Sequence, residues 1–292
     1  MKILVPATSA NLGPGFDCLG LSLGLFNEIE IYKSNVSSLS VSGEGSDNIH
    51  LKKNNIFIQI FNEIYQKLSG QKNHFRFIFK NNIPLSRGLG SSSATIVGAI
   101  VGAYAMSGFK IEKEKILNEA LNYETHPDNI APAILGGFVC SIVEENKVYS
   151  IKKDIDENLR AIIVIPDAIM NTEQSREALP ANLSLSDCVF NLSHSSFLTA
   201  CFLEKKYELL ALASKDKLHQ MQRMKNLPEL FEVQKFALEN KALMSTLSGS
   251  GSSFFSLVYK ENVNFFIQKM TQKFSNFRIE CLEFDNKGFE IC

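Results

Sequence analysis

Hydrophobic residues follow two different periods along the chain. Apolar side chains recur at every third or fourth position from Asn55 to Ser69, which predicts an amphipathic helix ended by Gly70. Further helical patterns are expected at residues 94–107, 112–123, 188–203, 205–214, 228–240 and 262–273. Alternating or β-branched runs, which are typical of strands, occupy residues 2–6, 24–33, 36–43, 74–79, 138–143 and 160–166.

The order of these elements lacks the regular strand–helix–strand rhythm of a doubly wound sheet. We therefore expect an α+β protein with two lobes, which suits a chain of 292 residues. The charged stretch 152–158 is the candidate boundary, and it gives an N-terminal lobe at 1–152 and a C-terminal lobe at 153–292. The polar stretch 171–187 is expected to form a loop.

Composition narrows the class of protein. Hydrophobic residues make up 45% and charged residues 21%, as in ordinary globular proteins. A net charge of −1 gives no electrostatic reason to expect nucleic acid or an anionic membrane as a partner. The weakly polar window 95–109 is too short to span a membrane and no secretory signal is recognised, so we expect a cytoplasmic protein. The six cysteines form no CxxC pair, which favours reduced thiols over a disulfide framework or a zinc site.

A loop rich in glycine and serine carries the clearest chemical signal. It consists of Pro84, Leu85, Ser86, Arg87, Gly88, Leu89, Gly90, Ser91, Ser92, Ser93 and Ala94. Glycine lets the backbone approach a ligand closely, and free N–H groups at the start of the following apolar helix favour an anion such as phosphate. The loop lacks the lysine of a Walker A motif, and Ser93 stands where a dinucleotide fingerprint needs glycine. A plain helix cap without a ligand is the alternative.

Three motifs in this order resemble those of the GHMP kinases. They are residues 6–17 (PATSANLGPGFD), residues 84–94 (PLSRGLGSSSA) and residues 247–252 (LSGSGS). The resemblance covers nearly the whole chain. It implies a two-lobed α+β fold, with an N-terminal lobe like ribosomal protein S5 and a ferredoxin-like C-terminal lobe. It also implies ATP as the phosphoryl donor, held by residues 84–94, with Asn55 near the adenine.

The remaining polar motifs resemble the branch of this family that phosphorylates homoserine. They lie at residues 124–132, 172–180 and 219–228. Homoserine carries an ammonium group, a carboxylate and a primary hydroxyl, and arginine pairs bidentately with carboxylates. The resemblance therefore assigns the carboxylate to two arginines, the ammonium group to an aspartate, and the rest of the lining to three polar residues: Arg176 and Arg223, Asp17, and Asn11, His126 and Thr172. The alternative for each arginine is a solvated surface position.

The resemblance also assigns the catalytic groups. Ser91 and Glu124 are expected to hold a magnesium ion bound to ATP. Asn129 stands where several relatives have an aspartate base, so alignment by Asn129, Asp17 and Ser91 would carry catalysis. Asp128 leaves the question of a general base open. The alternatives are a kinase for another small alcohol, such as mevalonate, or a non-catalytic nucleotide sensor, and a homodimer is the default assembly.

Overall fold

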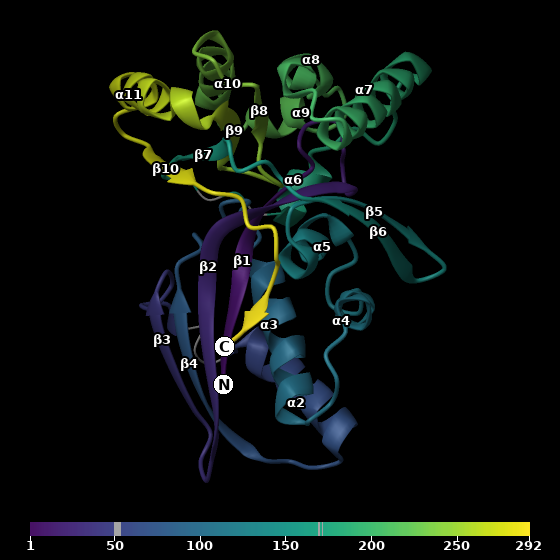
Figure 1. The fold of residues 1–292 in the computed structure, drawn as a ribbon, viewed down its shortest axis with the longest axis vertical. Coiled ribbons are helices and arrows are strands. Elements are labelled where there is room, and N and C mark those ends of the chain that lie inside the picture. The colour runs from purple at the N-terminus through teal and green to yellow at the C-terminus, as the bar shows by residue number, and fades with distance from the viewer. Residues whose placement is uncertain (50–53, 169, 171) are drawn as a thin grey trace.

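The computed structural model describes residues 1–49, 54–168, 170 and 172–292, without the side chains of 172–174. Its elements form two lobes, each built on one sheet with helices packed on one face (Figure 1). Both lobes mix helix and strand, as the α+β prediction requires. Within the described residues, no helix is both long and apolar enough to cross a membrane.

The first lobe contains a seven-stranded sheet among the described residues. Its central path runs β11-β1-β2-β4-β3, and a hairpin of β5 and β6 extends from β2. Only β3 and β4 pair in parallel; the other pairs are antiparallel. The strands are β1 (Lys2–Ala10), β2 (Leu19–Ser34), β3 (Ser38–Gly43), β4 (His74–Asn81), β5 (Phe138–Glu144), β6 (Lys147–Lys153) and β11 (Glu290–Ile291).

Among the described residues, the helices that cover this sheet are α2 (Ile56–Ser69), α3 (Ser91–Met106), α4 (Lys113–Ala120) and α5 (Pro127–Leu135). Helix α3 is apolar on nearly all sides because it is buried between β1, β2 and α2. Its two interior glycines permit this close packing. A Cβ at Gly98 would lie 2.4 Å from the side chain of Ile29, and one at Gly102 would lie 2.6 Å from Ile31. The sheet therefore holds the start of α3, where the glycine loop ends, in a fixed place.

The second lobe is a four-stranded antiparallel sheet in the order β10-β7-β9-β8, with helices on its outer face (Figure 1). Its strands are β7 (Leu159–Ile165), β8 (Met244–Leu247), β9 (Phe254–Tyr259) and β10 (Arg278–Leu282). The longer helices are α7 (Leu185–Leu203), α10 (Glu229–Glu239) and α11 (Val263–Lys273). Short helical turns complete the lobe: α6 (Thr172–Glu177), η1 (Tyr207–Leu209), α8 (Leu210–Ala213), α9 (Gln220–Met224) and η2 (Lys260–Asn262).

The chain passes between the lobes more than once. The predicted boundary at 152–158 covers the last two residues of β6 and the link to β7. A division after residue 152 would assign β11 to the C-terminal lobe, whereas the structure pairs β11 with β1, matching Ile291 with Ile3. The main chain of Phe284 also bridges to Leu23 in β2. The last ten residues therefore belong in space to the first lobe.

Several predicted elements differ from the observed ones. Strand β1 continues through Pro6 to Ala10, with a register shift after Pro6. The helix expected at 205–214 is broken into η1 and α8. The loop expected at 171–187 contains α6 and the first turn of α7, and β6, α5 and α9 were not predicted. Each omitted element is nine residues or shorter, too short for a clear period.

Candidate active site

The three glycine-containing motifs meet where the two lobes join. Main-chain hydrogen bonds connect them: Thr8 N donates to Leu89 O (3.1 Å), and Gly249 N donates to Ala10 O (3.1 Å). The first motif thus lies between the glycine loop and the turn at 247–252. Residues 239 positions apart in sequence are therefore in direct contact here.

Two glycines in the loop are required by close contacts. Gly88 has φ +73°, and a Cβ there would lie 2.1 Å from the carbonyl oxygen of Ser248. The Ser248 hydroxyl donates a 2.7 Å hydrogen bond to Gly88 O, which fixes the loop against the turn at 248. Gly90 has φ +70° and is the N-cap of α3, where no side chain caps the helix. The first N–H groups of α3 therefore point out of the loop, as an anion site requires.

Asn129 lies directly against the start of α3. The Thr8 hydroxyl donates a 2.7 Å hydrogen bond to Asn129 Oδ1. A Cβ on Gly90 would be 3.3 Å from the same oxygen. The contact with Thr8 orients the Asn129 amide, so that its NH2 group is the donor left for another partner.

Asp17 is the centre of a charged cluster. Its carboxylate accepts two hydrogen bonds from Arg176, at 2.7 and 3.0 Å, and lies 3.6 Å from Nδ1 of His126. Asn11 holds the backbone of this turn: its Oδ1 accepts from Asp17 N (3.0 Å) and its Nδ2 donates to Gly249 O (3.1 Å). Asn11 and Asp17 both adopt positive φ, which asparagine and aspartate tolerate better than most residues. The structure thus brings four of the six predicted substrate residues together.

Arg223 lies beside this cluster and is buried, with 2% of its surface exposed. Its guanidinium donates to Gly249 O (3.0 Å) and to Ser175 O (3.4 Å). The guanidiniums of Arg223 and Arg176 lie 5.2 and 5.1 Å from the centre of the Phe16 ring. Burial, together with the charge of Arg176, lowers the pKa of Arg223 to about 10. The solvated surface alternative is therefore wrong for Arg223.

Three residues of the site were assigned no binding role from the sequence. Thr8 orients Asn129, and Phe16 contacts both arginines. His219 is fully buried, with Nε2 2.8 Å from the carbonyl oxygen of Gly13. Thr8 and Phe16 stand inside the quoted first motif, so their position in it was the available signal.

The roles predicted for Asn55 and Thr172 stay predictions. Asn55, expected near adenine, is the N-cap of α2, and its Oδ1 accepts from Ile58 N at 3.2 Å. That bond uses the side-chain oxygen and leaves the adenine role as a prediction. Thr172 begins α6, but its side chain lies outside the described residues.

Burial and neighbouring carboxylates raise the pKa of two acidic residues in this site. Burial raises the pKa of Glu124, an effect partly offset by Arg176 and increased by Asp17. Burial raises the pKa of Asp128 to about 7, and the charges of Asp17 and Glu124 add to the rise. Asp128 therefore releases its proton near neutral pH rather than near its usual value of 3.8.

Replacing Asp128 with asparagine should flatten the dependence of stability on pH. Between pH 3.8 and about 7 the folded protein holds a proton on Asp128 that the unfolded chain has released. Its free energy of unfolding therefore falls as pH rises through this window. We compare the free energy of unfolding of Asp128→Asn with that of the wild type at each pH. This difference should shift by roughly 2–4 kcal/mol in favour of the variant as the pH rises from 5 to 8. Urea titrations at both pH values measure this, with the exposed Asp47→Asn as control; parallel pH curves for Asp128→Asn and wild type would contradict it.

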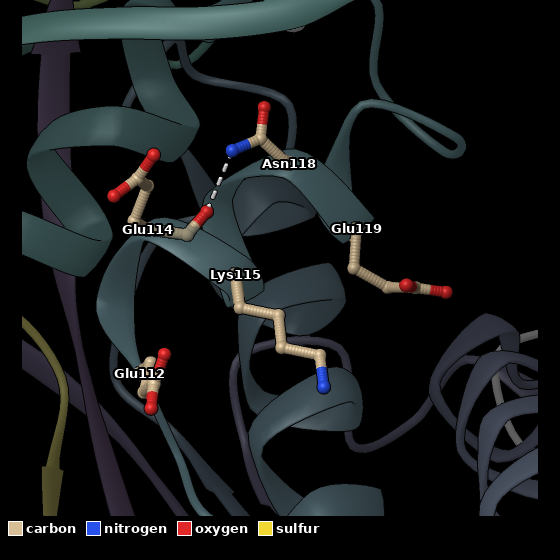
Figure 2. A pocket seen from close by; sticks show the side chains of 5 residues that line it. All are labelled: Glu112, Glu114, Lys115, Asn118 and Glu119. Carbon is tan, nitrogen blue, oxygen red and sulfur yellow. Dashed lines mark hydrogen bonds between the residues drawn. The ribbon is translucent and has the colours of Figure 1, made fainter.

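A separate hollow of about 470 Å³ lies over α4 and contains none of the motif residues. Glu112, Glu114, Lys115, Asn118 and Glu119 line it (Figure 2). Three of its carboxylates are paired with lysines, Glu112 with Lys110, Glu114 with Lys147 and Glu119 with Lys67. Asn118 donates to Glu114 O within the helix. These pairings are typical of a solvated helix surface. We therefore place the active site at the three motifs, residues 6–17, 84–94 and 247–252.

Comparison with known proteins identifies the family. The model of the GHMP kinases N terminal domain matches residues 55–137, and that of the GHMP kinases C terminal matches residues 198–276. A Campylobacter jejuni protein named homoserine kinase is 75% identical over 292 residues, which is 100% of both chains. The chain belongs to the GHMP kinase family, and within it to the homoserine kinases.

Solved structures agree with this placement. The crystal structure of homoserine kinase from Cytophaga hutchinsonii matches with a TM-score of 0.88 and 27% identity, over 100% of this chain and 97% of that chain. The mevalonate kinase of Methanococcus jannaschii, at 16% identity, shares the fold with a TM-score of 0.72, over 97% of this chain and 98% of that one. The two-lobed α+β fold and the resemblance drawn from the motifs are confirmed.

Proposed function

We propose that this protein transfers the γ-phosphoryl group of ATP to the hydroxyl of L-homoserine, giving O-phospho-L-homoserine for threonine biosynthesis. The proposal rests on the proximity of a phosphate-binding helix start to a charged cluster that suits an amino acid. An uncapped helix start suited to phosphate lies against Asn129, and a cluster of opposite charges suited to an amino acid lies beside it. The relatives named homoserine kinase support the same acceptor.

The charged cluster matches a zwitterion. Asp17 and Arg176 pair with each other, and both Arg176 and Arg223 lie over the Phe16 ring. An amino acid entering between them would give its ammonium group to Asp17 and its carboxylate to the arginines. One ion pair would then be exchanged for two, which compensates for displacing the Asp17–Arg176 contact. Mevalonate has a carboxylate but no ammonium group, so it would compete with Asp17 for Arg176 and offer Asp17 no cation in return.

The residues present also fit a magnesium ion carried by ATP. Burial raises the pKa of Glu124, and a nearby cation would favour its charged form. Across the described part of the chain, no group of three or more histidine, cysteine or carboxylate side chains is arranged to hold a metal ion alone. Mg²⁺ suits this arrangement, since it takes one or two protein ligands and completes its shell with phosphate and water. We assign Glu124 and Ser91 to it; when bound, it neutralises charge on the β- and γ-phosphates.

Alignment carries the chemistry in this proposal. Asn129 cannot accept a proton, and its NH2 group, oriented by Thr8, is placed to donate to the acceptor's hydroxyl oxygen. The transition state of phosphoryl transfer is loose, so full deprotonation of the hydroxyl is not required beforehand. Well-oriented reactants can gain ~7–11 kcal/mol, more than a general base typically supplies. Asp128, with its pKa near 7, is the residue to test as a base.

An acceptor panel tests the proposal. ADP release is measured with ATP and, in turn, L-homoserine, mevalonate, galactose and shikimate. We expect turnover on L-homoserine alone, with a product whose mass includes one added phosphoryl group. Turnover on mevalonate without homoserine would assign another acceptor, and ATP binding without turnover on any compound would favour a nucleotide sensor. A cytoplasmic location and a homodimer stay predictions from the sequence, to be tested by fractionation and by sedimentation.

A further inference from the structure

Two cysteines face each other next to the charged cluster. Cys18 directly follows Asp17, and Cys140 lies in β5, where it is in register with Leu19 of β2. Their sulfur atoms are 3.8 Å apart, and the two residues are 122 positions apart in sequence. Ser141 N donates to Cys18 O at 2.9 Å, so the main chain holds the pair in place. Both are free thiols and only half-buried.

We propose that Cys18 and Cys140 form an oxidation site, in which a hydroperoxide links them as a disulfide and thereby weakens binding of the amino-acid acceptor. The Cys140 thiolate would attack the peroxide: a sulfur–oxygen bond forms, the oxygen–oxygen bond breaks, and the leaving oxygen departs as water or alcohol after taking a proton. Cys18 then attacks that sulfur, the sulfur–sulfur bond forms, and hydroxide leaves with the Cys18 proton as water. The two sulfurs lose two electrons and the peroxide gains them.

The surroundings of the pair favour this order of steps. The hydrogen-bonded contact with Cys18 lowers the pKa of Cys140, which favours its thiolate form. The same hydrogen bond, with burial, raises the pKa of Cys18. The sulfurs need to approach by about 1.8 Å to reach the disulfide length of ~2.05 Å. Side-chain rotation and a small shift of the turn at 16–18 can supply that movement.

The linkage would act on the cluster through the backbone. Asp17 adopts φ +57° and holds Arg176 by two hydrogen bonds, and Cys18 is its immediate neighbour. Displacing Cys18 toward β5 displaces Asp17, the residue proposed to bind the ammonium group. This consequence rests on the proposed function. The start of α3 at Gly90 is contacted by Thr8 and Asn129, neither of which the linkage involves, so ATP binding is expected to change little.

Peptide mapping tests the oxidation site directly. The fully reduced protein is treated with hydrogen peroxide, quenched with a thiol-blocking reagent and digested without reductant. We expect a linked pair of peptides containing Cys18 and Cys140 in the wild type and in Cys292→Ser, and none in Cys140→Ser. Linkage of other cysteine pairs alone, or irreversible oxidation of both thiols without linkage, would overturn the proposal. Peptide mapping detects the disulfide whether or not the protein is active. If the proposed function is wrong, the reduced protein will be inactive on homoserine, and this result is distinct from the absence of linked peptides.

Kinetics test the consequence. Linked wild-type protein should show a KM for homoserine raised by roughly tenfold, since a 1 Å misplacement can cost as much as 10²-fold, with the KM for ATP within about twofold. Dithiothreitol should restore the original KM, and peroxide should leave the KM of Cys140→Ser unchanged. A fully linked protein with unaltered KM for homoserine, or equal loss in Cys140→Ser, would overturn the role assigned to the disulfide.

Discussion

Replacing Arg223 with leucine is expected to raise the KM for homoserine by about 100-fold while leaving the KM for ATP within about twofold, because a desolvated, charge-assisted contact is worth roughly 2–3 kcal/mol. Arg223 is buried and held by Gly249 O and Ser175 O, so its guanidinium is oriented before any ligand arrives. Leucine retains the apolar contact with Phe16 but provides no donor for a carboxylate. Steady-state kinetics with each substrate varied in turn measure both constants.

A matched control separates recognition from general damage. Arg76 is an exposed arginine of β4 whose guanidinium lies 5.8 Å from the centre of the Tyr32 ring, and Arg76→Leu should leave both constants unchanged. Because Arg223 also supports Gly249, circular dichroism and thermal unfolding should accompany the kinetics. Equal losses in the constants for homoserine and ATP would mean that Arg223 supports the architecture of the whole site and does not bind the carboxylate.

Changing Gly88 to alanine is expected to lower kcat/KM for ATP by roughly 100-fold, with a smaller effect on homoserine. The added Cβ would lie 2.1 Å from Ser248 O and 3.0 Å from the backbone of Gly251, so it meets main chain that cannot rotate away. The loop must therefore move away from the turn at 248, and misplacement by about 1 Å can cost 10²-fold. Isothermal titration with a non-hydrolysable ATP analogue and steady-state kinetics measure the loss.

The chain offers a close control for this variant. Gly108 has φ +75°, nearly the same as Gly88, but a Cβ there would meet nothing within 4 Å. Gly108→Ala therefore carries the same backbone strain, about 1–2 kcal/mol, without the collision. We expect it to lose some stability and retain its affinity for ATP. If both variants lose affinity equally, strain alone explains the effect and the loop has no special contact with phosphate.

Elements with strong local signals were predictable from the sequence. Helix α2 was expected at 55–69 and is observed at Ile56–Ser69, because Asn55 caps its start and Gly70 adopts the left-handed conformation at its end. Helix α5 was not predicted because prolines occupy its first position and its interior. Strand β1 continues through Pro6 because a change of register there accommodates the missing N–H group, and that depends on the partner strand.

The sequence predicted which residues form the site, but not which of them contact one another. The resemblance assigned Asp17 and Arg176 to opposite ends of a substrate, and nothing local to either residue shows that they pair directly across 159 positions. The same holds for Cys18 and Cys140, which appeared scattered in the sequence. The pairing of β2 with β5 brings Cys18 to Cys140, and α6 brings Arg176 to Asp17. Both are long-range effects that local periodicity does not carry.

The return of the final strand to the first sheet has a practical consequence for dissecting this protein. Lys2 and Cys292 exchange main-chain hydrogen bonds, with Lys2 N donating to Cys292 O (3.3 Å) and Cys292 N to Lys2 O (2.9 Å), and the two ends lie together in Figure 1. A fragment that ends near residue 152 would lack β11, the neighbour of β1 on one side. The complementary fragment would contain β11 without the strand that it pairs with. We therefore expect neither half to fold fully without the other, whereas a short peptide joining the adjacent ends would leave every strand with its partner.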